Sequence, residues 1–340
     1  MESDKEITSY DKKNSRISYI DIIKGIGILM VIFQHCTSID EGNLILSSFS
    51  RGILTYHMPL FFFASGLVVK DTNSDIFYSK KVKSLLIPVI IFRLANVVIY
   101  TLLLLCNKTS WYTTFSFGGF WFLLSLFYIE CIYYFVFNVI IQKKEKKNIK
   151  IFLSGVLLLG LGLIYSNYIL GEEVTIATSL VGYFFFTIGI VVRKMLDLSN
   201  QVIRKNIWLK LICFGTGILI IGITTIVSKN NAPIYMFVSS YGNPVLFVIF
   251  AVWGIVGIVT LSIAIGENSV LELFGKNSLI ILLTHFPIVK VLLLLTDRFG
   301  MKEWYIPLII FGVIVLCEWI IIVLINTFKS YCLAKIKYAE

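Results

Sequence analysis

Residues 16–35 read Arg-Ile-Ser-Tyr-Ile-Asp-Ile-Ile-Lys-Gly-Ile-Gly-Ile-Leu-Met-Val-Ile-Phe-Gln-His. The run is long and apolar enough to enter a membrane, yet it carries Asp21, Lys24 and His35. In a helix, the eleven-residue step from Lys24 to His35 returns to nearly the same face, about 16 Å along the axis, and Asp21 lies within about 40° of that line. This stripe must face other protein or a watery cavity, so it is the first candidate for chemistry.

The composition of the chain predicts a polytopic membrane protein. Hydrophobic types make up 57% of the 340 residues and charged types 15%, against about 25% charged residues in a typical globular protein. The net charge of +10 does not indicate a nucleic-acid partner, because the basic residues lie in short loops between apolar runs. The cysteines show no CxxC spacing and the histidines no i, i+3 or i, i+4 spacing, so neither a disulfide framework nor a metal site is predicted.

Nine further apolar runs follow the first, and each is near the length that a helix needs to cross about 30 Å of hydrocarbon. We interpret the first run as a retained helix rather than a cleaved signal peptide, because an ionisable residue interrupts it and no small-residue cleavage site follows. The further runs lie at 52–69, 85–105, 120–141, 151–169, 174–192, 208–227, 244–265, 279–296 and 305–328.

The loops between these runs alternate in charge, as the positive-inside rule predicts. Loops on one side are rich in lysine and arginine, whereas loops on the other side carry acids or a single lysine. The pattern predicts an all-α, polytopic transmembrane helix bundle of about ten spans with both termini in the cytoplasm. The loops at 266–278 and 297–304 discriminate least between the two sides.

The chain divides into one membrane domain and two short ends. Residues 1–15 are polar and mixed in charge, which predicts a flexible cytoplasmic tail. Residues 16–330 form the transmembrane domain, and residues 331–340 form a second cytoplasmic tail. No loop is long enough to fold by itself, so the bundle is expected to carry the function.

All three histidines lie in apolar runs. The topology places His35 and His57 toward the outer side of the membrane, and His285 toward the inner side, about 10 Å into its span. Because histidine accepts and returns a proton near neutral pH, this placement predicts proton-transfer chemistry inside the bundle. The alternative for His285 is a structural role in which its ring donates to a backbone carbonyl.

Other polar residues in the runs have both a functional and a structural interpretation. Arg93 and Glu130 lie at comparable depth, where they form either an ion pair or part of a site. Trp121 is either an interfacial anchor or a platform for an acceptor. Ser65 and Gly66 allow another helix to approach closely. Glu318 is a further intramembrane acid with no obvious partner.

Five segments in this order resemble the acyltransferase 3 family over nearly the whole chain. Within that family, the sequence is similar to the branch of fucose 4-O-acetylase-like, polysaccharide-modifying O-acetyltransferases. The family commonly carries an arginine where this chain has Lys24, which keeps the charge and loses the bidentate fork. The segments are Asp21-Ile-Ile-Lys-Gly through His35, His57-Met-Pro-Leu-Phe-Phe-Phe-Ala-Ser-Gly, Leu-Leu-Ile-Pro88, Phe120-Trp-Phe-Leu, and Phe274-Gly-Lys-Asn-Ser-Leu through His285.

The resemblance implies transfer of an acetyl group from cytoplasmic acetyl-CoA to a sugar hydroxyl of a cell-envelope or capsular polysaccharide, or of its lipid-linked precursor. It implies a bacterial plasma membrane, no tightly bound cofactor, and leaves a homo-oligomer open. His35 fits a general base, and Asp21 or a neighbouring span fits the group that orients or charges it. Lys24, together with Lys80, Lys81 and Lys83 at the inner face, supplies cations for the donor phosphates or an oxyanion. The catalytic set is then His35, Asp21, Lys24 and His57, and the set that binds substrate or acyl donor is His285, Arg93, Glu130, Trp121, Ser65 and Asn277.

Two other classes of protein fit parts of the sequence. A proton-coupled transporter or flippase also lines its passage with buried charges and histidines, but no internal repeat or paired broken helices are seen. A sensory or scaffold protein is disfavoured because no soluble module accompanies the membrane domain. Dependence on acetyl-CoA separates an acyltransferase from a carrier.

Overall fold

A computed structural model describes residues 18–37, 44–69, 74–105, 121–140, 146–168, 175–231, 233–301 and 303–337. The described chain is almost entirely helical, and its extended pairing is limited to one isolated bridge between Tyr235 and Ser240. The predicted all-α polytopic bundle is therefore confirmed. The predicted tail at 1–15 and the end of the chain after residue 337 lie outside the described residues.

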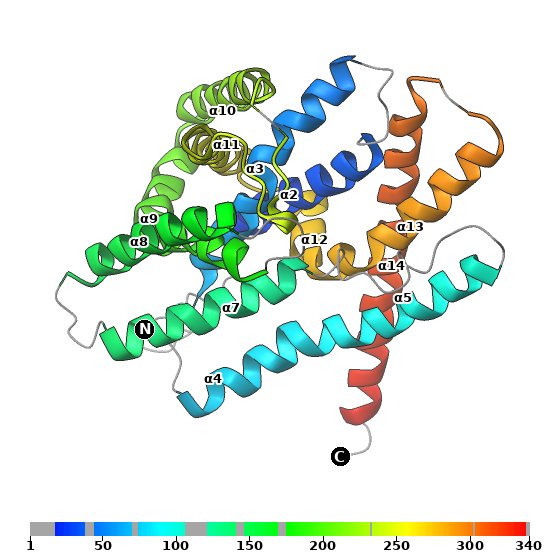
Figure 1. The fold of residues 1–340 in the computed structure, drawn as a ribbon, viewed down its shortest axis with the longest axis horizontal. Coiled ribbons are helices and arrows are strands. Elements are labelled where there is room, and N and C mark those ends of the chain that lie inside the picture. The colour runs from blue at the N-terminus through cyan, green and yellow to red at the C-terminus, as the bar shows by residue number, and fades with distance from the viewer. Residues whose placement is uncertain are drawn as a thin grey trace, which may run out of the picture.

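Each of the predicted runs falls on a helix of the described chain (Figure 1). Eight of the described helices are long and apolar enough to cross a membrane, against about ten predicted spans. The helices of the other two runs, α3 and α5, are not among these eight. The helices are α2 (Ser18–Thr37), α3 (Leu44–Val68), α4 (Ser74–Lys81), α5 (Ile87–Leu105), α7 (Trp121–Phe135), α8 (Lys147–Tyr168), α9 (Thr175–Lys205), α10 (Ile207–Ser228), α11 (Pro244–Ile265), α12 (Ser269–Lys276), α13 (Ser278–Arg298) and α14 (Ile306–Lys337), with π-helical turns η1 (Val82–Leu86) and η2 (Val136–Ile140) and a 3-10 turn η3 (Met236–Val238).

Several helices extend beyond the apolar runs that predicted them. Helix α3 begins well before residue 52, and α9 continues past residue 192, where Arg193 donates to Asp197 one turn later at 3.0 Å. Such an i, i+4 pair supports helix outside the hydrocarbon. Helix α12 occupies the stretch predicted as a loop at 266–278. The sequence did not predict it, because eight residues are too few to be recognised as a span.

Asparagine side chains cap the N-termini of three helices that follow one another in the chain, α10, α11 and α12. The side-chain oxygens of Asn206, Asn243 and Asn268 accept hydrogen bonds from backbone N–H groups of the first turns of α10, α11 and α12. Helix α11 also has proline in its first turn, where a missing N–H costs nothing. These caps satisfy donors that the helix itself leaves unpaired.

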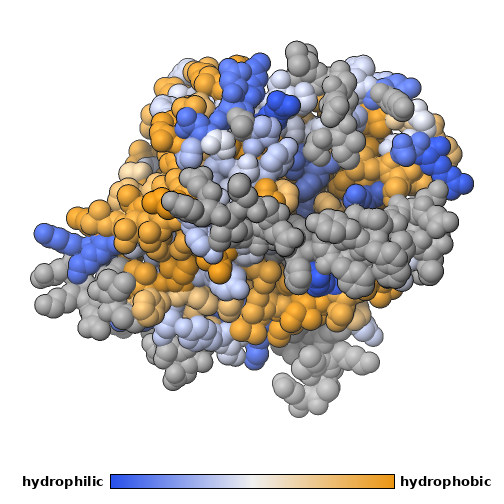
Figure 2. Space-filling view, in the orientation of Figure 1, coloured by the Kyte–Doolittle hydropathy of each residue, from blue (hydrophilic) through white to orange (hydrophobic). Residues whose placement is uncertain are grey.

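Helices α2 and α3 form the interior of the bundle. Helix α2 packs against α3, α11, α12, α13 and α14, whereas α3 also packs against α9 and α10. Both run through the middle of the view in Figure 1, between α8–α11 on one side and α13 and α14 on the other. Helices α8 and α10 are mostly exposed. Figure 2 shows broad apolar areas on this face of the molecule, as expected where helices meet lipid.

Two glycines let the backbones of α2 and α12 touch. A Cβ atom on Gly275 would overlap with the backbone carbonyl of Asp21, and one on Gly25 would overlap with the carbonyl of Leu271. The two glycines thus make reciprocal contacts, each against the other helix. This close approach fixes α12 against the N-terminal half of α2.

The same reciprocal arrangement joins α3 to α9. A Cβ on Gly66 would overlap with the carbonyl of Phe186, and one on Gly189 would overlap with the carbonyl of Phe63. The close helix approach predicted at Ser65-Gly66 is confirmed. Helix α3 is therefore held at backbone distance from a neighbour, in the same way as α2.

Replacing Gly275 by alanine is expected to lower the unfolding midpoint of the protein in detergent. The added methyl group has no room against the Asp21 carbonyl, and overpacking of this kind costs about 1–3 kcal/mol. Gly222→Ala on α10 is the matched control, because no atom lies within 4 Å of its added Cβ. Equal unfolding midpoints for the two variants would contradict the proposed backbone contact.

Candidate active site

The three histidines converge from three different helices. His35 lies near the end of α2, His57 in the middle of α3 and His285 in the first half of α13. The ring centroids of His35 and His285 are 5.3 Å apart, with the planes inclined by 41°. His57 and His285 are both close enough to interact electrostatically with His35. The interior of the bundle thus holds all the imidazoles of the chain in one cluster.

The expected separation of His285, at the inner side, from His35, at the outer side, is wrong. Helix α13 follows α2 in the same direction, since Gly275 meets Asp21 and His285 then meets His35. Between these two contacts the chain leaves α12 at Lys276 and begins α13 at Ser278, and the sequence does not predict the direction that α13 takes after this turn.

His57 and His285 sit in the same local structure. Each is followed two residues later by a proline inside its helix, Pro59 in α3 and Pro287 in α13. In each, Nδ1 donates to the backbone carbonyl four residues earlier, at 2.9 Å for His57 and 2.7 Å for His285. A neutral imidazole that donates through Nδ1 presents a lone pair at Nε2. Both rings are therefore held in place by one nitrogen and can act as bases through the other.

Access to the three rings differs. His57 and His285 are only 5% and 3% exposed, whereas His35 is half-buried, so a water-sized molecule reaches it. The ring of Phe286 packs edge-on against His35, with centroids 5.5 Å apart. The structural interpretation of His285 required a hydrogen bond from its ring to a backbone carbonyl. This hydrogen bond is present, but it uses only Nδ1 and leaves Nε2 out.

Asp21 and Lys24 lie at the other end of α2, beside α12. Fourteen residues place Asp21 about 21 Å from His35 along the helix, so Asp21 is too far away to orient that ring. Asp21 is buried and Lys24 is half-buried. The rings of His285 and Phe286, which the structure places against the His35 ring, both come from helix α13.

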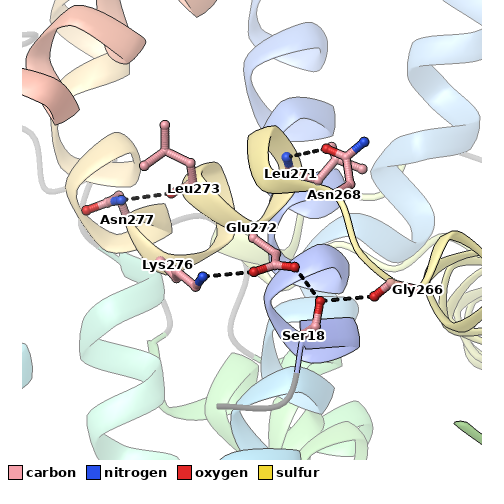
Figure 3. Close-up of polar contacts among 8 residues, drawn as sticks. All are labelled: Ser18, Gly266, Asn268, Leu271, Glu272, Leu273, Lys276 and Asn277. Atoms are coloured by element: carbon pink, nitrogen blue, oxygen red, sulfur yellow. Dashed lines mark hydrogen bonds and ion pairs between the residues drawn. The ribbon is translucent and has the colours of Figure 1, made fainter. Parts of the chain in front are cut away.

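Polar contacts attach α12 to the start of α2 (Figure 3). The Ser18 hydroxyl lies 3.0 Å from the Gly266 carbonyl and against the Glu272 carboxylate, which also receives Lys276 at 2.8 Å. The hydrogen bond from Lys276, then that from Ser18, holds the pKa of Glu272 below its usual range. These contacts add to the glycine contact at the same end of α2.

Glu130 forms an ion pair with Lys81, and not with Arg93 as expected. Lys81 ends α4, which packs on α7 through the ring of Phe77 stacked on Tyr134 at 4.5 Å. The stacked rings hold the end of α4 against α7, so that Lys81 lies beside the buried Glu130 carboxylate. Arg93 is half-buried on α5. The structural interpretation of Glu130 as a member of an ion pair therefore holds with a different partner.

The remaining predicted site residues make local contacts. The Ser65 hydroxyl donates to the Phe61 carbonyl at 2.8 Å, within α3. The Asn277 side chain donates to the Leu273 carbonyl at 2.8 Å, where α12 ends. Trp121 is half-buried at the first position of α7. The hydrogen bonds of Ser65 and Asn277 support the local structure of α3 and of the end of α12.

The sequence did not reveal the partner of Glu318. This carboxyl group on α14 is fully buried, and the Thr284 hydroxyl lies 2.9 Å and 2.8 Å from its two oxygens. Thr284 directly precedes His285, so the same turn of α13 contacts both α14 and His35. Two features of the sequence pointed to this turn of α13. Thr284 lies directly before His285, and residues 57–59 and 285–287 share a His-x-Pro pattern.

The sequence profile of the acyltransferase domain, acyltransferase 3, matches residues 17–323 of the chain. The chain belongs to the acyltransferase 3 family. No curated protein and no solved structure gave a match in the corresponding comparisons. Family membership and the apolar helices together make the protein a multi-pass membrane acyltransferase.

In this acyltransferase 3 member, the matched region runs through all the segments that the structure brings together. It includes α2 with His35, α3 with His57 and α13 with His285. It also includes the contact between α2 and α12 at the opposite end of α2. The histidine cluster and the end of the bundle that carries Lys24 thus share one central helix, α2.

Glu272→Gln is expected to make the stability of the protein less sensitive to acid. A lowered pKa in the folded state contributes stability above the pKa of the unfolded chain, about 4.3, and that contribution is lost as the pH falls through the folded value. Unfolding midpoints between pH 6 and pH 3.5 should therefore fall further in the parent than in the variant. Lys276→Gln removes the larger of the two causes that lower the pKa of Glu272, so it should also make the stability less sensitive to acid. An identical pH dependence in all three proteins would show that Glu272 does not hold α12.

Proposed function

We propose that the protein is an O-acetyltransferase that moves an acetyl group from cytoplasmic acetyl-CoA to a sugar hydroxyl of a cell-envelope or capsular polysaccharide, or of its lipid-linked precursor. The observation that carries the proposal is the convergence of His35, His57 and His285 inside a bundle of the acyltransferase 3 family. Acyl transfer to a hydroxyl needs a group that removes the hydroxyl proton, and buried neutral imidazoles supply one.

His35 is the general base of the proposed reaction. Its ring is the accessible one of the three, so an acceptor hydroxyl can reach it. As the sugar oxygen attacks the thioester carbonyl carbon, its proton passes to a ring nitrogen of His35.

The inner end of α2 is the proposed donor end. Lys24 is half-buried there, and Lys80 and Lys83 are exposed on the segment that leads into α5. Cations such as these suit the phosphate groups of acetyl-CoA, which is bound as a substrate and not as a resident cofactor. Lys81 contributes less, since its ammonium group already pairs with Glu130. Arg93 and Trp121, both half-buried, remain candidates for contacts with the donor or the acceptor.

The proposal is tested by proton NMR of surface polysaccharide from cells that carry the intact gene, a deletion, or His35→Ala. Loss of the O-acetyl signal is expected in the deletion and in His35→Ala, with the polymer itself still present. Gly222→Ala, a change on the exposed face of α10, serves as the control for expression and should keep the signal.

Two other results would change the assignment. If the deletion loses the acetyl signal and His35→Ala keeps it, another group is the base. If neither strain loses acetyl groups and the amount of exported polymer falls, the protein acts as a transporter or flippase. Transfer of label from acetyl-CoA by the purified protein separates the two classes directly, because a carrier has no need of the thioester.

A further inference from the structure

One ring nitrogen of His285 makes a hydrogen bond, and the other has no hydrogen-bond partner among the described residues. Nδ1 donates to the Ile281 carbonyl at 2.7 Å, whereas Nε2 is buried and has no hydrogen-bond partner among the described residues. A buried acceptor without a partner loses the hydrogen bonds that water would supply, so it is unfavourable unless a ligand or proton completes it. The side chain as a whole is 3% exposed.

The ring that carries the unpaired nitrogen lies beside the ring of the proposed base. With ring centroids 5.3 Å apart, the facing edges of His35 and His285 come within reach of a hydrogen bond after a small rotation of either ring. Phe286, the next residue, closes another side of the His35 ring. Helix α13 therefore contributes two neighbours to His35: Phe286, which packs against its ring, and His285, which can accept a proton from it.

The two rings also differ in what they can reach. His35 is accessible to a water-sized molecule, whereas His285 is buried behind it on a helix that starts beside the inner end of α2. The proposed acceptor approaches the first ring, and the proposed donor enters from the end that α12 and Lys24 define. A single imidazole would have to serve the acceptor oxygen and the donor sulfur in turn.

We propose that His285 is a second acid–base residue of the reaction, which receives the proton from His35 and delivers it to the sulfur of coenzyme A. This inference rests on the proposed acetyl transfer. The acceptor oxygen forms a bond to the acyl carbon, and its proton moves to His35. The carbon–sulfur bond breaks with its electron pair on sulfur. The proton passes from His35 to Nε2 of His285 and from there to the thiolate, so both imidazoles end neutral and free coenzyme A leaves as the thiol.

The test compares two acyl donors in the purified full-length protein. With acetyl-CoA, His285→Gln should lower kcat by about 100-fold or more, the usual size of a general-acid contribution, with little change in KM. With the acetyl thioester of an acidic aromatic thiol, whose thiolate leaves unprotonated, the loss should shrink to less than about tenfold. His35→Gln should lower turnover of both donors alike, because the acceptor still has to lose its proton.

An equal loss with both donors would overturn the proposal and leave His285 as a positioning residue. Full activity of His285→Gln with acetyl-CoA would overturn it as well. If the parent protein transfers nothing from acetyl-CoA, the proposed function fails instead, and the two failures are thereby distinguished. The unfolding midpoint of each variant, compared with that of Gly222→Ala, reports whether the fold is kept.

A second measurement needs no altered His285. The chain has only three histidines, so labelling with ¹⁵N-histidine gives a short spectrum that single variants assign. Coenzyme A should shift the Nε2 resonance of His285, because its thiol meets that nitrogen. Desulfo-coenzyme A, which differs only in lacking the thiol, should not shift it. The same response to both compounds would contradict contact between His285 and the sulfur.

Discussion

Direct backbone contact between α2 and α12 is the constraint on which the rest of the structure depends. Helix α2 carries Asp21 and Lys24 into an environment where lipid offers no hydrogen bonds, so protein must cover that face. Gly25 and Gly275 allow α12 to lie directly against it, and Ser18 adds a polar link to Glu272. Once α12 is placed, α13 continues alongside α2 and brings His285 to His35. The position of the histidine cluster thus follows from two residues that have no side chain.

The cluster itself combines two kinds of histidine. His57 and His285 are each held through Nδ1 by their own helix, and each is followed by a proline that interrupts the regular hydrogen bonding nearby. His35 is placed by its neighbours, His285 and Phe286. Rings held by the backbone keep one tautomer, which leaves the other nitrogen ready for proton exchange. The proposed chemistry needs this division between fixed groups and one accessible group.

The sequence predicted the helical class and the position of a helix at each apolar run, because the distribution of apolar residues responds to the thickness of a membrane more than to tertiary detail. It also selected His35, His57 and His285, because histidines in apolar runs are costly to keep without a purpose. It did not predict that Lys81 would replace Arg93 beside Glu130, or that His285 would touch His35. Both depend on how helices tilt and on aromatic stacking between them, and single-sequence patterns carry no information on either. Helix α12 was missed because a helix of eight residues produces no span-length signal.

Helix α3 follows α2 directly, but the other partners that cover α2 are synthesised long after it. Ser18 meets Gly266 and Glu272, residues 248 and 254 positions further along the chain. During biogenesis, α2 must therefore enter the membrane before α12 exists, and the face that α12 covers stays without this partner until most of the protein has been made. A chain cut short before residue 266 would lose the segment that shields its first span, and cellular quality control would meet an exposed intramembrane charge. The order of synthesis makes completion of the C-terminal third a condition for the stability of the N-terminus.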